Sequence, residues 1–266
     1  MIPLPSQPKI VKKEGAKAIF EIESLYPGYG VTVGNSLRRV LLSSLQGAAI
    51  TQMKVRGVSH EFSTIPGVQE DVITLMLNLK KLRFRVFSEE PQTGKLHIKG
   101  EKEAKGSDFE LPSQVELVNK DCRIATLTAK SSDLEIEITI EKGVGYFARE
   151  DRKKEKLGIG VIPLDAIFTP LKKVSFKVEN MRVGERTDFD KLSLEIETDG
   201  TISPETAFSQ AAKILVLHFS MFSETFAEEI PVPGSDKEAT AKITKKKRAS
   251  AVKKQKHEKK KKGKKT

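Results

Sequence analysis

The amino-acid sequence predicts an α+β protein in which antiparallel sheets pack against helices. Short runs of alternating apolar and polar residues, separated by turn residues, recur over 83–140 and are typical of antiparallel strands. Similar runs occur at 9–23 and again at 174–198. Two longer stretches, 28–45 and 203–226, instead repeat apolar residues at the spacing of a helix.

The first predicted elements are a hairpin and a helix. Between Lys9 and Glu23, two extended runs are separated by Glu14-Gly15, which predicts a pair of antiparallel strands. Gly47 is predicted to end the helix that follows, just past its last turn. Five residues of this helix fall on one stripe and are expected to face a core: Leu37, Val40, Leu41, Ser44 and Leu45.

Arg38 and Arg39 point away from that apolar stripe. One interpretation is an ordinary core helix with a solvated basic face. The other is that Arg39 is held out to bind a partner, because a guanidinium presents a planar fork of donors that fits a carboxylate. The pattern by itself leaves both interpretations open.

The middle of the chain predicts a strand over 48–58 and a helix over 67–82. Glu70 and Asp71 would lie in the first turn of that helix and Lys80 and Lys81 in its last turn, where their charges complement the helix dipole. The strand runs that follow, up to Ile140, predict a small β-rich subdomain inserted after the first helix.

The last helix has a strong start signal, with Ser203 as N-cap, Pro204 in the first position and Glu205 in the first turn. It is apolar on nearly every side as far as Phe226. Because one sheet covers only one face, the second apolar face needs another cover. A symmetric partner chain would supply it, as would a second domain of the same chain.

The net charge of +11 comes from one end of the chain. Between Lys242 and Thr266 there are fourteen Lys or Arg against one Glu, which leaves 33 basic and 35 acidic side chains in residues 1–241. From residue 230 the composition loses large apolar residues, so the segment is expected to be disordered. It would serve either as a solubilising tail or as a non-specific binder of phosphate.

A single cysteine, Cys122, excludes an internal disulfide and favours a reducing compartment. No apolar run approaches the ~18 residues that span a bilayer, and no signal peptide is recognisable at the amino terminus. We therefore expect a cytoplasmic protein that does not associate with membranes.

No arrangement of residues predicts catalysis or a cofactor. Gly28, Gly30 and Gly34 lack the Gly-Lys-Ser/Thr of a phosphate loop and miss the dinucleotide spacing by one residue. Asp188 and Asp190 would share a metal only with a third acidic ligand, and two carboxylates before a strand are more often a solvated turn. The histidines are far apart and lack ligand spacing with the cysteine.

Four motifs nevertheless resemble those of the alpha subunit of bacterial DNA-directed RNA polymerase, specifically its amino-terminal domain. The resemblance extends over about residues 9–229. The motifs are Gly30-x-Thr32-x-Gly34-Asn35-x-Leu37-Arg38-Arg39-x-Leu41-Leu42-Ser43-Ser44; His60-Glu61-Phe62-Ser63-Thr64 with Gly67-Val68-Gln69-Glu70-Asp71 and Leu77-Asn78-Leu79-Lys80; Gly143-Val144-Gly145-Tyr146; and Arg182-Val183-Gly184-x-Arg186-Thr187-Asp188-x-Asp190-Lys191-Leu192 through Thr198-Asp199-Gly200-Thr201.

The resemblance implies assembly of the polymerase rather than catalysis by this chain. Residues 1–47 and 172–229 would form a discontinuous dimerisation subdomain of antiparallel sheet plus two helices, 48–171 an inserted β-rich subdomain, and 230–266 a disordered Lys-rich tail. The homodimer would scaffold the beta and beta-prime subunits of a nucleotidyltransferase that transcribes DNA. No cofactor or metal is implied for this chain.

The resemblance also implies which residues meet which partner. The beta subunit would contact Arg38, Arg39, Leu42 and Lys80. The beta-prime subunit would contact Val178, Arg182 and Arg186. The dimer interface would contain Leu37, Leu41, Leu45, Leu215, Phe219, Phe222 and Phe226.

The sequence departs from the family pattern at its carboxy end, where a lysine tail stands in place of the usual linker and small DNA-binding domain. The tail would offer weak, sequence-independent contact with promoter DNA. Its candidate residues are Lys245, Lys246, Lys247, Arg248, Lys253 and Lys254. The alternative is a free-standing dimeric nucleic-acid-binding protein that acts through this tail.

Overall fold

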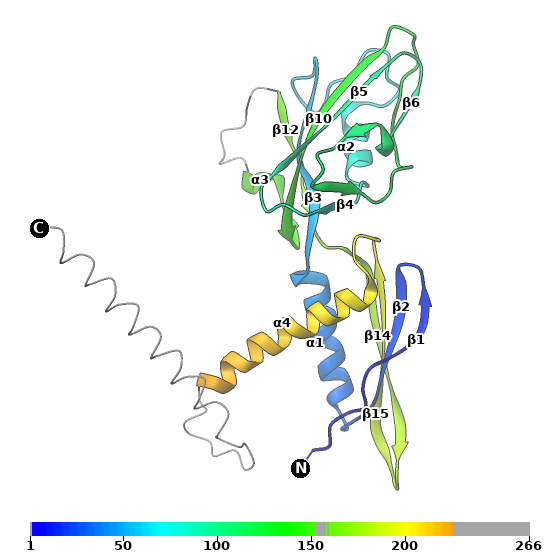
Figure 1. Cartoon of the computed structure of the whole chain (residues 1–266), viewed down its shortest axis with the longest axis vertical. Coiled ribbons are helices and arrows are strands. Elements are labelled where there is room, and N and C mark those ends of the chain that lie inside the picture. The colour runs from blue at the N-terminus through cyan, green and yellow to red at the C-terminus, as the bar shows by residue number, and fades with distance from the viewer. Residues whose placement is uncertain (1, 153–157, 159, 226–266) are drawn as a thin grey trace, which may run out of the picture. The chain divides into compact units, whose positions relative to one another are not determined.

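A computed structural model describes residues 2–152, 158 and 160–225 (Figure 1). The chain divides after Leu217 into two compact units. The described residues form several antiparallel sheets with helices, which confirms the predicted α+β class.

A four-stranded antiparallel sheet joins the two ends of the folded chain. Its strand order is β1-β2-β15-β14. The predicted hairpin is confirmed as the pair β1 and β2, and β2 pairs with β15 so that Phe20 lies opposite Leu194. The strands are β1 (Lys9–Glu14), β2 (Lys17–Leu25), β14 (Leu171–Val183) and β15 (Arg186–Thr198).

Two helices, α1 (Tyr29–Ser44) and α4 (Pro204–Thr225), bury apolar side chains against this sheet. The Phe20 ring of β2 stacks on the Phe208 ring of α4 with centroids 4.9 Å apart. The predicted stripe of α1 enters the same core, where Leu41 is fully buried. The sheet and both helices therefore share one hydrophobic core.

The predicted role of Gly47 is wrong. Helix α1 ends at Ser44, Leu45 is already extended, and Gly47 lies inside the next strand. A Cβ atom at Gly47 would overlap the carbonyl oxygen of Phe168. Glycine is needed there because the segment around Phe168 crosses at close range, and not to end the helix.

A five-stranded sheet of order β12-β3-β10-β5-β7 contains the predicted central strands and encloses a second core with α2 (Val72–Leu79). Its middle strand, β10, pairs with β3 on one side and β5 on the other. The strands are β3 (Gln46–Val55), β5 (Gln92–Lys99), β7 (Phe109–Glu110), β10 (Asp133–Val144) and β12 (Val161–Pro163).

Helix α2 is shorter than the predicted 67–82. Asp71 is its N-cap and accepts a hydrogen bond from the Thr74 backbone N–H at 2.8 Å. Glu70 lies before the helix, where its carboxylate accepts the Thr126 N–H at 2.6 Å. This pairing with a neighbouring strand explains why the first predicted turn is not helical.

Smaller elements complete the part of the chain that the structure describes. Three short antiparallel pairs are β4 (Phe84–Val86) with β8 (Val115–Leu117), β6 (Glu103–Lys105) with β9 (Arg123–Thr126), and β11 (Tyr146–Phe147) with β13 (Ala166–Ile167). A 3-10 turn spans Gly106–Asp108 and a short helix, α3, spans Arg149–Arg152.

Two arginines of the inserted region bind the turn after β15. Arg85 Nε donates to the Thr201 carbonyl at 3.0 Å, and Arg83 Nε lies 3.6 Å from Asp199 Oδ2. These contacts tie the second core to the first one. The predicted boundaries of the subdomains, 48 and 171, stay predictions.

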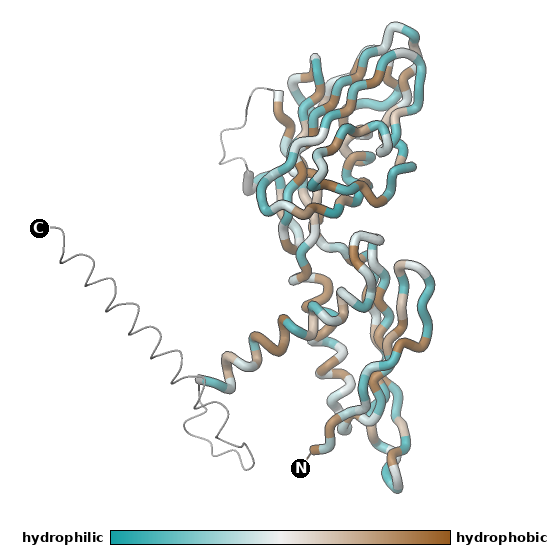
Figure 2. The backbone as a smooth tube through the Cα atoms, viewed as in Figure 1, coloured by the Kyte–Doolittle hydropathy of each residue, from teal (hydrophilic) through white to brown (hydrophobic). Residues whose placement is uncertain are grey.

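The start of α4 is confirmed. Ser203 Oγ accepts the Thr206 N–H at 3.2 Å, and Pro204 is the first helical residue. Figure 2 shows apolar residues along the later part of this helix, where Val216, Phe219 and Phe222 are exposed. No helix among the described residues is long and apolar enough to span a membrane.

Candidate partner-binding surfaces

One face of α1 is exposed and carries both arginines. Val31, Asn35, Arg38 and Leu42 recur at helical spacing on this face, and Arg39 lies beside them. Within the described residues, neither the Arg38 nor the Arg39 guanidinium makes a hydrogen bond or an ion pair, and only the Arg39 backbone carbonyl accepts one, from Ser43 Oγ at 2.7 Å. Both guanidinium groups are therefore available to a carboxylate outside the chain.

The exposed face of α1 continues onto an apolar patch formed by β11, β13 and the end of β10. A Cβ atom at Gly145 would lie 3.4 Å from the Ser43 carbonyl oxygen, so this segment runs past the last turn of α1. Val144, Tyr146 and Ile167 are each more than half exposed there. We call these three residues together with Val31, Asn35, Arg38, Arg39 and Leu42 the α1 surface.

Lys80 is held beside this surface by an ion pair. Its Nζ lies 2.9 Å from Asp165 Oδ2, and the bond lowers the pKa of the Asp165 carboxyl. Asp165 precedes β13, and its other oxygen accepts the Arg149 N–H at 3.2 Å. The ion pair thus places Lys80 next to the apolar patch. The charge of its ammonium group is already balanced by the Asp165 carboxylate.

The sequence did not predict Asp165 or the patch. Gly143-Val144-Gly145-Tyr146 was among the motifs, yet no role was assigned to it. An aromatic pair directly after Gly-Val-Gly is a detectable signal, and its first residue, Tyr146, is 63% exposed in a strand of two residues.

The tip of the β14–β15 hairpin carries the residues predicted to meet the beta-prime subunit. Arg182 is exposed and its Nε donates to the Gly184 carbonyl at 2.8 Å. Arg186 forms two bonds with Asp188, of 3.0 and 2.7 Å, and its guanidinium carbon lies 5.3 Å from the centre of the Phe189 ring. We call Arg182, Glu185 and Arg186 the hairpin surface.

Val178 differs from those residues. It is half-buried, and its Cγ1 lies against the backbone of α1 at Gly30. Its side chain packs inside the chain, which leaves little of it to contact a partner.

The two aspartates weighed as metal ligands have separate partners. Asp188 binds Arg186, and this bond lowers the pKa of the Asp188 carboxyl. Asp190 is 6% exposed, and its Oδ2 accepts the Gly28 and Gly30 N–H groups at 2.9 Å each. The N–H groups that a phosphate loop would use are therefore occupied by a carboxylate of the chain itself.

Comparison with known proteins identifies the family. The model of the RNA polymerase Rpb3/RpoA insert domain matches residues 51–169. The DNA-directed RNA polymerase subunit alpha of Symbiobacterium thermophilum is 48% identical over 213 residues, which is 80% of this chain and 67% of that protein. The chain belongs to the RNA polymerase alpha-subunit family.

Other alpha subunits are equally similar. That of Oceanobacillus iheyensis is 48% identical over 203 residues, 76% of this chain and 64% of that protein. That of Alkaliphilus oremlandii is 49% identical over 212 residues, 80% of this chain and 67% of that protein. The chain spans about two thirds of the length of these relatives.

Three α1 residues that the alpha-subunit family implies as dimer contacts are already buried within one chain, and their place at a dimer interface stays a prediction. Leu37, Leu41 and Leu45 are 4%, 0% and 2% exposed within a single chain, where they pack against the sheet and α4. A helical stripe in a sequence does not distinguish a core of one chain from an interface between two. These side chains belong to the first core.

The residues predicted on the last helix differ in exposure. Leu215 is half-buried against the first core. Phe219 and Phe222 are each 59% exposed, with ring centroids 6.4 Å apart. Phe226 and the tail residues Lys245, Lys246, Lys247, Arg248, Lys253 and Lys254 lie outside the described residues.

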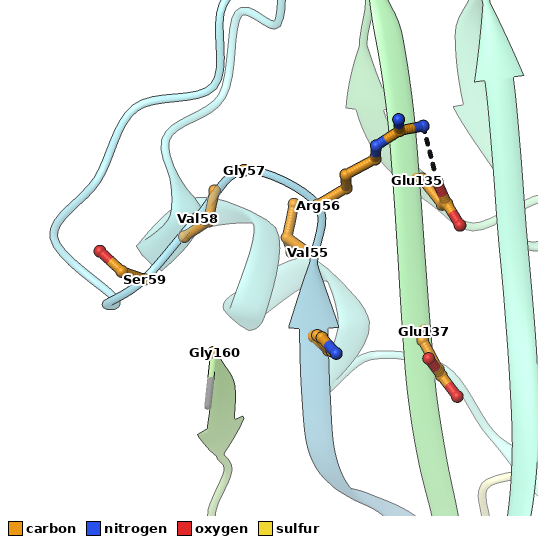
Figure 3. A pocket seen from close by; sticks show the side chains of 9 residues that line it. Val55, Arg56, Gly57, Val58, Ser59, Glu135, Glu137 and Gly160 are labelled. Atoms are coloured by element: carbon orange, nitrogen blue, oxygen red, sulfur yellow. Dashed lines mark hydrogen bonds and ion pairs between the residues drawn. The ribbon is translucent and has the colours of Figure 1, made fainter. Parts of the chain in front are cut away.

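A hollow of about 640 Å³ lies over the outer face of the five-stranded sheet (Figure 3). Its charged lining is mixed, with Lys54 and Arg56 from the β3 side and Glu135 and Glu137 from β10. Arg56 donates to Glu135 at 3.2 Å. Because two basic and two acidic side chains line it, the hollow has no excess of either charge to select a ligand.

Proposed function

We propose that this chain is a non-catalytic scaffold subunit of DNA-directed RNA polymerase, which dimerises and nucleates assembly of the beta and beta-prime subunits. The observation that carries the proposal is the α1 surface, in which the Arg38 and Arg39 guanidinium groups have no partner among the described residues and stand beside exposed apolar side chains, in a chain of the alpha-subunit family.

The α1 surface has the composition of a protein interface. Arginine and tyrosine are enriched at interface hot spots, and an arginine that meets a carboxylate in a desolvated interface forms a strong bidentate bond. Leu42, Val144 and Tyr146 supply apolar area around the arginines. We assign this surface to the beta subunit, with Arg39 as its main anchor and Lys80 at its margin.

The hairpin surface is assigned to the beta-prime subunit. Arg182 is its best candidate, because its side chain is exposed and, in the part of the chain that the structure describes, bonds only to a carbonyl of its own turn. Arg186 is paired with Asp188 through two bonds, so it would contact beta-prime through a face of its planar group rather than as a free cation.

Dimerisation is assigned to the later part of α4. Val216, Phe219 and Phe222 expose large apolar side chains along one helix, and water-exposed apolar area of this kind favours association. The symmetric partner would bring the same helix, as in most homodimers.

A second candidate function follows from the charge of the tail. Fourteen Lys or Arg against one Glu between Lys242 and Thr266 would attract phosphate, so a free-standing dimeric nucleic-acid-binding protein is the alternative. In either case we expect the protein to work in the cytoplasm.

Affinity purification of the tagged full-length chain from its own cells distinguishes the scaffold function from the nucleic-acid-binding function. A scaffold subunit is expected to copurify with two very large proteins in a fixed ratio, also after nuclease treatment. Recovery of the chain with nucleic acid alone, and without large proteins, would contradict the scaffold function.

A further inference from the structure

Asp190 supplies from β15 the cap that α1 lacks in its own sequence. The N-cap residue is Gly28, which has no side chain to accept the first N–H groups of the helix. Asp190, 160 residues away from Gly30, accepts two of these N–H groups with one buried oxygen. A carboxylate at this end of a helix is further stabilised by the helix dipole.

The backbone of α1 also lies directly on the β14–β15 hairpin. A Cβ atom at Gly30 would lie 2.8 Å from Val178 Cγ1 and 2.9 Å from Asp190 Cβ. One turn later, a Cβ atom at Gly34 would lie 2.7 Å from Phe176 Cδ2. Because both glycines face the hairpin, no side chain of α1 separates the helix from it at these two points.

These contacts connect the two surfaces assigned above. Arg38 and Arg39 lie on the exposed side of α1, whereas Arg182 and Arg186 lie at the tip of the hairpin that carries Asp190. We propose that Asp190 is a positioning residue, which fixes α1 to the hairpin and so holds the α1 surface and the hairpin surface in one constant relation. The proposal rests on the proposed function, since it concerns how that function's two surfaces are held.

Removal of the carboxylate would leave the Gly28 and Gly30 N–H groups without their acceptor, and the Gly30 N–H is buried. Asp190→Ala is therefore expected to loosen the start of α1 while the packing of Gly34 on Phe176 remains. Asp190→Asn keeps an acceptor oxygen of the same reach and is expected to restore the connection. Asp188→Ala is a matched control, because that carboxylate faces Arg186 and not α1.

A distance measurement in the full chain tests the connection without any partner. Spin labels at Val31→Cys in the first turn of α1 and Lys177→Cys on β14, in a Cys122→Ser background, report the distance between the start of the helix and the hairpin. An excess of unlabelled chain keeps the measured distances within one molecule. We expect a narrow distribution for the parent, for Asp190→Asn and for Asp188→Ala, and a broad one for Asp190→Ala.

An unchanged distribution in Asp190→Ala would overturn the proposal, as would an equally broad one in Asp188→Ala or Asp190→Asn. A thermal melt of each variant shows that the measurement is made on folded protein. The parent should give a narrow distance distribution even if the assigned partners are wrong. The distance measurement therefore tests the proposal independently of the proposed function.

Binding of the purified cognate beta subunit is the second readout. Asp190→Ala is expected to weaken it about tenfold at a temperature where the variant is folded, although Asp190 is buried away from the α1 surface. Unchanged binding by Asp190→Ala, with binding lost in Arg39→Ala, would overturn the positioning role alone. Unchanged binding by Arg39→Ala would instead contradict the proposed function.

Discussion

Lys17 of β2 and Glu195 of β15 form an ion pair on the outer face of the four-stranded sheet, with Nζ 2.7 Å from Oε1. Ser175 Oγ and Lys173 Nζ of β14 donate to the same carboxylate at 3.0 and 3.3 Å. Lys17 contributes most, followed by Ser175, and together these donors lower the pKa of Glu195 from 4.5 to about 2. One carboxylate therefore joins three strands.

The lowered pKa makes a testable contribution to stability that depends on pH. Because the folded-state pKa lies below the unfolded value, the contribution is complete above about pH 4.5 and is lost as the pH falls towards 2. We expect Glu195→Gln to reduce the free energy of unfolding by about 1 kcal/mol at neutral pH, as for partly exposed ion pairs. Urea unfolding of both proteins at pH 7 and pH 3 measures the difference.

The difference in free energy of unfolding between the parent and Glu195→Gln should be smaller at pH 3 than at pH 7. A difference that stays constant or grows as the pH falls would show that the Glu195 carboxylate does not bind Lys17, Ser175 and Lys173 in the folded state. Lys12→Gln serves as a control, since its ion pair with Glu14 is mostly exposed on the edge strand.

Gly34→Ala tests the close approach of α1 to the hairpin. The new methyl group would lie 2.7 Å from Phe176 Cδ2 and 2.9 Å from Leu192 Cδ1. Overpacking of this kind costs about 1–3 kcal/mol, which outweighs the gain of about 1 kcal/mol from replacing a helical glycine by alanine. Denaturant unfolding should show net destabilisation for Gly34→Ala, whereas Asn35→Ala on the exposed face should be neutral or stabilising.

Phe222→Asp tests the assignment of the dimer interface to the later part of α4. A charge in place of an exposed apolar ring would disfavour burial against a second copy, so we expect a monomer in analytical ultracentrifugation. Lys213→Asp introduces the same side chain at an exposed polar position of this helix and should remain dimeric. A dimer of unchanged affinity in Phe222→Asp would exclude this part of α4 from the interface.

Deletion of residues 235–266 tests the tail. If its basic side chains bind phosphate, the deletion should weaken the affinity of the assembled polymerase for DNA of any sequence, and more so at low salt. Filter binding over a range of salt concentrations measures this, and the slope against salt should become shallower. Equal affinity at low salt with and without the tail would remove the DNA-binding role.

Local patterns predicted most of the regular elements. The hairpin 9–23 and the start of α4 at Ser203 follow from alternation and from capping residues that are neighbours in the sequence. The family was also recognisable, because its motifs are continuous stretches of sequence. For these features, the information lies within a few residues.

Features that depend on distant partners were missed or misjudged. In the sequence, Asp190 was considered as a metal ligand. Its capping role was missed because the Gly28 and Gly30 N–H groups that it caps lie about 160 residues away. Gly47 was taken for a helix stop because nothing local reveals Phe168. Leu41 was expected in a core from its helical stripe and at the dimer interface from the family resemblance; the structure buries it within one chain, and the dimer contact stays a prediction.

Recruitment of the beta subunit by an Arg39→Ala variant tests the central claim most directly. The Arg39 side chain is exposed and has no partner within the described residues, so its removal should not disturb the fold or the dimer. We expect Arg39→Ala to sediment as the parent dimer, to melt at the parent temperature and to bind the beta subunit at least tenfold more weakly. Binding of beta with parental affinity by this folded dimer would contradict the account.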